Sequence, residues 1–367
     1  MTLHCAFIGF GKSTTRYHLP YVLHRKDRWH VAHIYRRSAK PEEQAPQYSH
    51  IHFTSDLDEV LNDPQVTLVI VCTHADSHFA YAKRALEAGK NVLVEKPFTP
   101  TLEEAKTLFA LAKSKGLTVT PYQNRRFDSC FLTTKKVIES GKLGEIVEIE
   151  NHFDNYRPVD GGKPGLPQDG TFYGLGVHTL DQIISLFGRP HHVSYDIRSL
   201  RNKANPDDTF EAQLFYGNLK AIVKTSHLVK LPYPKFIVHG HKGSFIKYGI
   251  DQQETSLKAN IMPGEPGFGA DETVGLLEYV NEAGETVREE IPLESGDYGR
   301  VYDSLYETLV TVSQISSRNL KFSQTWRSSN AALNSHHLPQ LPLADKPSWL
   351  LCTHSYFLNR GVNFHPL

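Results

Sequence analysis

The stretch LHCAFIGFG, residues 3–11, decides the fold of this chain. Its apolar run predicts a buried strand, and Gly9 and Gly11 directly after it predict a tight turn into a helix. The backbone amides of such a turn and of the following helix can bind a pyrophosphate. Thr14 stands where a third glycine is usual, and we expect it to loosen the approach of the helix to the strand. A turn with a purely structural role is the alternative interpretation.

Strand-like and helix-like patterns alternate as far as residue 124. Within this region, Thr101 and Glu104 form a capping box and Gly116 ends the same helix. Strand candidates lie at 3–8, 30–35, 66–72, 92–95 and 117–121. The alternation predicts an α/β fold for residues 1–124, a Rossmann domain with a doubly wound parallel sheet. Such a sheet binds its ligands at the carboxyl ends of its strands.

The pattern changes after residue 124. One helix ends at Gly141, and a second helix at 176–187 interrupts a series of alternating strands joined by turns. These strands lie at 145–153, 193–200, 210–216, 219–227, 236–239 and 244–248. Turn-linked strands predict an α+β domain over residues 125–311, with a large, mainly antiparallel open sheet.

The bulk composition limits the function. Forty basic and forty acidic residues give no net charge, which argues against a nucleic-acid or anionic-membrane binder and favours a small-molecule partner. The four cysteines lie far apart and lack metal-site spacing, so we expect no structural metal and buried thiols in a reducing compartment. The sequence shows neither a signal peptide nor a membrane helix. We therefore expect a cytoplasmic protein.

Glu95-Lys96-Pro97 follows the apolar run at 91–94, at the predicted carboxyl edge of the sheet. A lysine packed among apolar strands loses its charge more readily than one on a helix surface. Such a lysine can give or take a proton near neutral pH. We expect Lys96 to be the acid/base residue of a dinucleotide-dependent enzyme.

The end of the second strand bears on the choice of cofactor. An acidic residue there would bind a ribose 2′-hydroxyl, but the sequence has Arg36-Arg37. Two guanidinium groups can hold a 2′-phosphate, which predicts NADP(H) as the preferred cofactor, with NAD(H) possible. The alternative is a solvated basic turn.

Thr73 and His74 close the third strand of the predicted crevice, and His78 lies one helical turn further on. Two histidines at this spacing could bind a metal, but no third ligand accompanies them, so we expect no metal. We expect these residues to form polar walls around the cofactor.

His178 and Asp181 lie three residues apart at the start of a helix in the second domain. This spacing places both on one face, where Asp181 could orient the imidazole. A histidine near a helix N-terminus tends to remain neutral. A core histidine that caps local structure is the alternative.

Taken together, these residues resemble the glucose–fructose oxidoreductase/inositol dehydrogenase/MocA (Gfo/Idh/MocA) family over about residues 3–311. The resemblance rests on Gly9-x-Gly11, 73–78, Glu95-Lys96-Pro97, 124–127 and the segment 176–181. It implies an NAD(P)-dependent oxidoreductase that transfers a hydride between nicotinamide and a CH–OH or C=O carbon of a small sugar, cyclitol or related compound. A homo-oligomer, a dimer or tetramer through the face of the open sheet, is also implied.

The resemblance also implies roles for individual residues. Lys96, His178 and Asp181 would be catalytic, with a cis bond between Lys96 and Pro97. Candidate cofactor contacts are Gly9, Phe10, Gly11, Lys12, Ser13, Thr14, Arg36, Arg37, Thr73, His74, His78, Glu95, Lys96, Asn124 and Arg126. Candidate substrate contacts are Tyr156, Arg157 and Tyr173.

One position departs from the family pattern. Many dehydrogenases of this family carry a carboxylate four residues before the histidine, where this sequence has Gly174. This departure leaves a second hypothesis open, a cofactor-binding sensor or regulatory protein without efficient turnover.

The composition changes at Val312. Residues 312–367 contain one acidic residue, Asp345, and two of the three tryptophans. Back-translated residues 313–334, read two bases along, permit PNFVKESEVLTNLEILERGFEQ, which resembles the ending expected of the family. We hypothesise a frameshift near Val312, so that 312–367 form an out-of-frame, poorly ordered tail. A genuine divergent extension is the alternative, and resequencing the locus decides between them.

Overall fold

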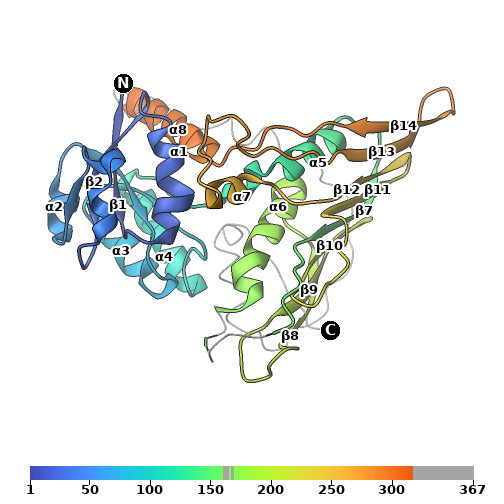
Figure 1. Ribbon diagram of the computed structural model, residues 1–367, viewed down its shortest axis with the longest axis horizontal. Coiled ribbons are helices and arrows are strands. Elements are labelled where there is room, and N and C mark those ends of the chain that lie inside the picture. The colour runs from blue at the N-terminus through green and yellow to red at the C-terminus, as the bar shows by residue number, and fades with distance from the viewer. Residues whose placement is uncertain (160–164, 167–168, 317–367) are drawn as a thin grey trace.

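The computed structural model describes residues 1–159, 165–166 and 169–316 of the chain. Two bodies lie side by side, with the first domain at the blue end of the chain and the second sheet at the opposite end of the long axis (Figure 1). Most of the tail predicted from Val312 onward, residues 317–367, lies outside the described residues.

The first domain contains a parallel sheet of six strands in the order β3-β2-β1-β4-β5-β6. Its strands are β1 (Leu3–Ile8), β2 (Trp29–Tyr35), β3 (His52–Thr54), β4 (Val66–Val71), β5 (Asn91–Val94) and β6 (Val119–Pro121). The order reverses between β1 and β4, which is where such sheets bind ligands. The predicted α/β fold class is confirmed, although β3 was not predicted.

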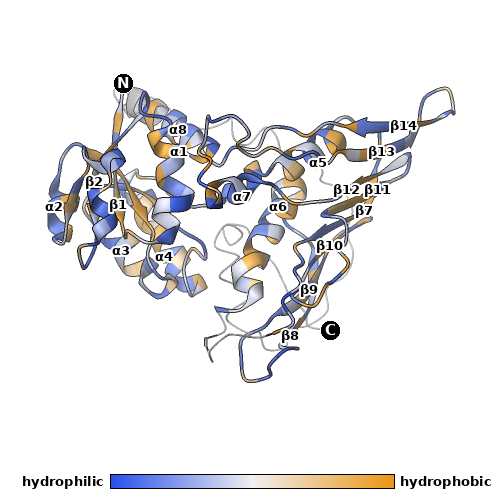
Figure 2. Ribbon diagram, viewed as in Figure 1, coloured by the Kyte–Doolittle hydropathy of each residue, from blue (hydrophilic) through white to orange (hydrophobic). Residues whose placement is uncertain are grey.

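Helices cover both faces of this sheet, as parallel strands require. They are α1 (Leu19–Leu23), α2 (Leu57–Asn62), α3 (Ala75–Glu87) and α4 (Leu102–Lys115). The capping box of α4 forms as predicted, and Gly116 ends it in the left-handed conformation. Apolar strand residues lie between helices on both sides (Figure 2), and they form two hydrophobic clusters, one on each face of the sheet.

The second domain contains eight strands in the order β14-β13-β12-β11-β7-β10-β9-β8. They are β7 (Ile146–His152), β8 (His192–Arg198), β9 (Thr209–Tyr216), β10 (Leu219–Ser226), β11 (Phe236–Gly240), β12 (Gly243–Lys247), β13 (Gly275–Val280) and β14 (Thr286–Ile291). All pairings are antiparallel except that of β7 with β10. The predicted large, mainly antiparallel sheet is confirmed, and β13 and β14 extend it.

Helices α5 (Ser129–Glu139) and α6 (Val177–Phe187) pack on the face of this sheet that is turned toward the first domain (Figure 1). Alternate residues of β10 point to them, namely Leu219, Ala221 and Val223, and all three are buried. The short helix α7 (Gln253–Lys258) lies between the two domains. The first half of α6 lies near the domain junction, because Asp181 pairs with Arg126, which directly follows the first domain.

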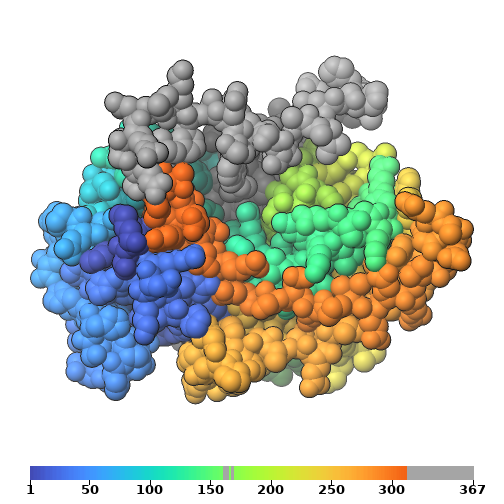
Figure 3. Space-filling model, turned by 90° about the horizontal axis from the view of Figure 1, so that it is seen from above, coloured from blue at the N-terminus to red at the C-terminus, as the bar shows by residue number. Residues whose placement is uncertain are grey.

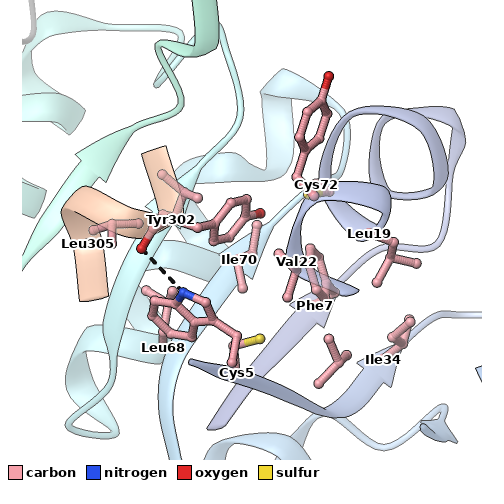
Figure 4. Packing of buried hydrophobic residues seen from close by; sticks show 14 of the residues in the cluster. Cys5, Phe7, Leu19, Val22, Ile34, Leu68, Ile70, Cys72, Tyr302 and Leu305 are labelled. Atoms are coloured by element: carbon pink, nitrogen blue, oxygen red, sulfur yellow. Dashed lines mark hydrogen bonds between the residues drawn. The ribbon is translucent and has the colours of Figure 1, made fainter. Parts of the chain in front are cut away.

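The chain returns to the first domain at its end. Helix α8 (Arg300–Ser316) follows an extended segment that runs back from the second sheet (Figure 3). Tyr302 and Leu305 pack against strand residues of the first domain, and the indole of Trp29 donates a hydrogen bond of 3.2 Å to the carbonyl oxygen of Tyr302 (Figure 4). The first domain is therefore completed by the last described helix.

Among the described residues, no helix combines the length and the apolar character needed to cross a membrane.

Candidate active site at the domain junction

The two glycines after β1 differ in what surrounds them. Gly9 has φ +108°, and a Cβ there would lie 2.5 Å from the carbonyl oxygen of Cys72 on the neighbouring strand end. In the part of the chain that the structure describes, no neighbouring atom lies within 4 Å of a Cβ built on Gly11. Gly9 therefore allows a close backbone approach, whereas Gly11 leaves open space beside the first turn of the helix at Lys12 and Ser13. A phosphate group fits this arrangement.

Thr14, which stands in place of a third glycine, is accommodated by a local change in the helix. Its side chain is fully buried, and its Oγ1 donates a hydrogen bond of 2.8 Å to the carbonyl oxygen of Gly9. The helix adjusts instead, because Leu19 donates its amide hydrogen to Thr14, five residues back, in a π-helical turn. The wider turn gives the threonine side chain room.

Glu95 is the centre of a buried polar network. It accepts hydrogen bonds from Ser13 Oγ and from the amide of Lys96, and it contacts His18 Nε2 at 3.1 Å. The other ring nitrogen of His18 lies 2.6 Å from the hydroxyl of Tyr302 on α8. Burial alone would raise the pKa of Glu95, but His18, Lys96 and Ser13 together lower the pKa to about 2. The network joins the glycine turn, the end of β5 and α8.

Lys96 follows β5 at the carboxyl end of the sheet, with its side chain partly exposed at the domain junction. The expected cis peptide bond between Lys96 and Pro97 is confirmed. The amide of Lys96 donates a hydrogen bond of 2.8 Å to the buried carboxylate of Glu95, which fixes the backbone at the lysine.

His78 is not a wall of the cofactor site, which corrects the sequence-based expectation. It is 1% exposed, and its ring nitrogens face the carbonyl oxygens of Pro97 at 2.8 Å and Thr73 at 3.0 Å. It therefore joins two turns at the carboxyl edge of the sheet. His74 remains exposed at the N-terminus of α3, and Thr73 accepts a hydrogen bond of 2.8 Å from Ser77.

Arg36 and Arg37 do not act as the matched pair that was predicted. Glu43 accepts two hydrogen bonds from Arg36, at 2.6 and 3.0 Å, which raises the pKa of the arginine and lowers that of the carboxylate. Arg37 is exposed. Lys40 donates a hydrogen bond of 2.5 Å to the carbonyl oxygen of Phe10 and stands beside the glycine turn. Lys40 therefore contacts the glycine turn directly, and the guanidinium of Arg37 is exposed to solvent.

His178 lies at the start of α6 and is 5% exposed. Burial, followed by the charges of Lys96, Arg125 and Lys235, lowers its pKa well below 6.5. The charge of Lys96, in the first domain, thus helps to keep this histidine of the second domain neutral. Among the described residues, His178 Nδ1 has no hydrogen-bond partner.

Asp181 does not orient His178, contrary to the sequence-based expectation. Its two carboxylate oxygens accept hydrogen bonds from Arg126, at 2.6 and 2.7 Å, and the aspartate side chain is 8% exposed. His178 and Asp181 share a helix face. The planar guanidinium of Arg126, however, offers the carboxylate two hydrogen bonds, which is a stronger interaction than one with the imidazole. Asp181 thus fixes Arg126 near the domain junction, and Asn124 lies buried two residues before Arg126.

The three predicted substrate contacts lie in different surroundings. Tyr156 is 49% exposed beneath the ammonium group of Lys230, 4.6 Å from its ring centre, and forms a backbone bridge to Leu228. Arg157 is exposed and donates its amide to the carbonyl oxygen of His227 at 2.8 Å. Tyr173 is 3% exposed and belongs to the core of the second domain. Their contact with substrate stays a prediction.

Several residues of this region were missed by sequence reasoning. They are His18, Lys40, Glu43 and Lys235. Each acts through a contact with a residue distant in sequence or around an irregular turn, and none lies in a pattern that predicts such a contact. In the part of the chain that the structure describes, no group of three potential metal ligands occurs.

Comparison with known proteins connects this geometry to a family. Residues 3–123 match the model of an oxidoreductase family's NAD-binding Rossmann fold, and residues 135–321 match that of its C-terminal alpha/beta domain. The chain is 85% identical over 309 residues to the uncharacterized oxidoreductase YhhX of Escherichia coli, covering 84% of this chain and 90% of that protein.

Two further relatives extend the comparison. The chain is 35% identical over 314 residues to scyllo-inositol 2-dehydrogenase (NADP(+)) IolW of Bacillus subtilis, covering 84% of this chain and 86% of that one. It also resembles the crystal structure of an oxidoreductase from Bacillus cereus, with a TM-score of 0.81 and 50% identity over 84% of this chain and 89% of the other. The crystal structure of YhhX gives a TM-score of 0.83, with 84% of this chain and 90% of that one covered. The chain therefore belongs to the Gfo/Idh/MocA family of oxidoreductases, and its first domain is the NAD-binding Rossmann domain of that family.

Proposed function

We propose that this oxidoreductase prefers NADP(H) and interconverts CH–OH and C=O at a carbon of a small sugar, cyclitol or related compound. The observation that carries the proposal is the position of Lys96 at the carboxyl end of β5, where Glu95 accepts hydrogen bonds both from the Lys96 amide and from Ser13 of the glycine turn. The relative IolW bears a name for NADP(+)-dependent oxidation of scyllo-inositol, which supports both the substrate class and the cofactor.

The cofactor, when bound, supplies the hydride that is exchanged with the substrate carbon. The turn at Gly9 and Gly11 would hold its pyrophosphate, because Gly11 leaves the space open. Arg37 and Lys40 would flank the adenosine ribose, and the exposed guanidinium of Arg37 would bind a 2′-phosphate. Glu43 positions Arg36, and Lys40 ties the same segment to the carbonyl oxygen of Phe10.

The proton exchange is assigned to Lys96. Its ammonium group would donate a proton to the substrate oxygen during reduction and take the proton back during oxidation. His178 stays neutral because of its burial and its cationic neighbours, so it can hydrogen-bond the same oxygen or a neighbouring hydroxyl. Arg126, held by Asp181, would stand beside the nicotinamide.

A binding and turnover experiment tests this proposal. NADPH fluorescence is titrated, and its oxidation is followed with a panel of carbonyl sugars and inososes for the wild type, Lys96→Met and the control Lys106→Met. Lys106 is half exposed on α4 in an ion pair with Glu103. We expect Lys96→Met to keep NADPH binding and lose roughly 100-fold or more of turnover. Turnover unchanged in Lys96→Met would contradict the assignment.

Cofactor preference is tested separately with two variants. Arg37→Ala should weaken NADPH binding by roughly 10- to 100-fold and leave NADH binding nearly unchanged, because one charge-assisted contact to the 2′-phosphate is lost. Arg36→Ala should weaken both cofactors, since it frees Glu43 beside the turn. Tighter binding of NADH than NADPH by the wild type would show that the preference is wrong.

A sensor without efficient turnover is the second candidate. It is favoured by Gly174, because among the described residues no atom lies within 4 Å of a Cβ at that position and no carboxylate takes its place. Saturable NADPH binding with no oxidation across the panel would favour the sensor. Turnover that depends on Lys96 would favour the enzyme.

We further propose that the protein works as a homo-oligomer in a reducing, cytoplasmic compartment. The free, buried thiols of Cys5, Cys72 and Cys130 support the compartment. The face of the second sheet turned away from α5 and α6 supports association, since it bears no helix of the described residues. A sizing measurement determines the number of subunits.

A further inference from the structure

Lys235 is a buried cation in the same region that the chemistry above does not use. It directly precedes β11 and is 3% exposed. Its Nζ donates a hydrogen bond of 2.6 Å to Oδ1 of Asn151 and lies 4.9 Å from the ring centre of Phe153 and 5.0 Å from that of Phe236. An ammonium group has three donor hydrogens, and among the described residues only this neutral amide oxygen accepts one of them.

A second buried lysine of the same sheet, Lys247, has several polar partners for its ammonium group. Lys247 is completely buried, and its Nζ contacts the carbonyl oxygen of Tyr248, the hydroxyl of Thr273 at 2.5 Å and the carboxylate of Asp271 at 3.6 Å. Lys247 thus has several polar partners, including a carboxylate. Lys235 keeps donor capacity unused, and buried donors in native proteins usually find a partner.

The acids near Lys235 are engaged elsewhere. Asp128 accepts a hydrogen bond of 2.8 Å from Tyr298, and Asp154 accepts one of 2.8 Å from the amide of Ser226. Both carboxylates act on Lys235 through space, as do the guanidinium of Arg125 and the thiol of Cys130. Within the described residues no ion pair joins Lys235 to a carboxylate, so its charge lacks a direct counterion there.

Lys235 lies next to the start of α6. Asn151, which accepts from Lys235, donates a hydrogen bond of 3.2 Å to the carbonyl oxygen of Thr179, the residue after His178. The charged side chains that act on His178 are Lys96, Arg125 and Lys235, and all three are cations. The unpartnered Nδ1 of His178 and the spare donors of Lys235 therefore lie in one positively charged region.

We propose that Lys235 and His178 form a subsite for an anionic oxygen of the substrate, a carboxylate or phosphate close to the carbon that exchanges hydride. This inference rests on the proposed function for the reacting carbon, and it narrows the substrate to an acidic sugar, a hydroxy acid or a phosphorylated polyol. An anion accepts the free donors of Lys235 and supplies the counterion that the buried ammonium lacks.

The titration of the lysine gives the subsite a pH dependence. Burial lowers the pKa of Lys235 to about 8, with the Arg125 charge acting in the same direction and Cys130 and Asp128 opposing it. The ammonium form is therefore present below pH 8 and is lost above it. Anion binding should weaken as pH rises through this value.

The test uses two small probes of the same shape, malonate and its neutral diamide, added to the full-length protein with NADPH bound. Binding is followed by NADPH fluorescence and by the imidazole signals of His178 in NMR spectra. The variants are Lys235→Met, Lys235→Gln, which keeps a hydrogen-bonding group near Asn151, and Lys220→Met. Lys220 is the control, because it pairs with Glu148 on the other face of the sheet. The side chain of Lys220 is 39% exposed.

We expect malonate to bind saturably and the diamide not to bind. Lys235→Met and Lys235→Gln should weaken malonate roughly tenfold or more, as loss of a charge-assisted contact predicts, while Lys220→Met should not. The subsite would be overturned if the wild-type protein bound malonate and the diamide equally well or bound neither of them. This comparison holds even if a lysine variant does not fold. Unchanged malonate binding in a folded Lys235 variant would also overturn it. Malonate binding without turnover of any sugar or acid would instead reject the proposed reaction.

Discussion

The two glycines of the turn after β1 give a paired prediction, in which the same substitution produces opposite defects. Gly9→Ala adds a Cβ 2.5 Å from the carbonyl oxygen of Cys72, at a residue whose φ is +108°. The backbone strain costs about 1–3 kcal/mol, and the forced separation of two strand ends costs about 1–3 kcal/mol more. Together these are a large part of the 5–15 kcal/mol that typically stabilises a domain.

Gly11→Ala should leave stability nearly unchanged, within about 1 kcal/mol. Its added methyl group has no neighbouring atom within 4 Å among residues 1–159, 165–166 and 169–316, but it occupies the space in which the pyrophosphate would lie. We expect NADPH binding to fall by roughly tenfold or more in this variant, because the backbone can no longer approach the phosphate closely.

Thermal unfolding and NADPH titration on both variants check the pair. Gly9→Ala should lower the melting temperature by roughly 5–15 °C or prevent folding, whereas Gly11→Ala should melt like the wild type and bind NADPH poorly. The reasoning is refuted if Gly11→Ala binds NADPH normally. It is equally refuted if Gly9→Ala is as stable as the wild type, since the close approach to Cys72 would then carry no cost.

Three other predictions concern the junction. The pKa of Glu95 is lowered from 4.5 to about 2, so its contribution of about 3 kcal/mol to the free energy of unfolding is present above pH 4.5 and lost as pH falls toward 2. In denaturation experiments, the stability of Glu95→Gln should therefore fall less steeply with acid than that of the wild type. Asp181→Asn should weaken NADPH or substrate binding through Arg126 by roughly tenfold without moving the NMR titration of His178, and a moved titration would restore the orienting role first expected of Asp181. In the wild type, His178 should stay neutral well below pH 6.5, so an imidazole that takes up its proton near that pH would contradict its cationic surroundings.

The sequence predicts best where local chemistry decides the structure. The first strand has the predicted bounds, because residues 3–8 are apolar and end at a glycine. The cap of α4 is formed by Thr101 and Glu104, three residues apart, and both hydrogen bonds of the box appear. Strand β14 was missed because its exposed and partly buried residues alternate around charged side chains, so it carries little apolar signal.

The site is less predictable than the fold. The pairs Arg36–Glu43 and Asp181–Arg126 depend on how distant segments meet, and no spacing rule reports such a meeting. A guanidinium group can bind a cofactor phosphate or a neighbouring carboxylate with similar geometry. Sequence reasoning therefore found the cationic residues but could not say which of them a carboxylate of the same chain had already taken.

The position of α8 has a consequence for how this protein is made. The hydrophobic core around Trp29, near the beginning of the chain, is completed by Tyr302 and Leu305, which are synthesised only after the whole second sheet. When only the first 124 residues have left the ribosome, the hydrophobic surface that α8 later covers is therefore exposed. It stays exposed during the synthesis of the entire second domain, until α8 has been made.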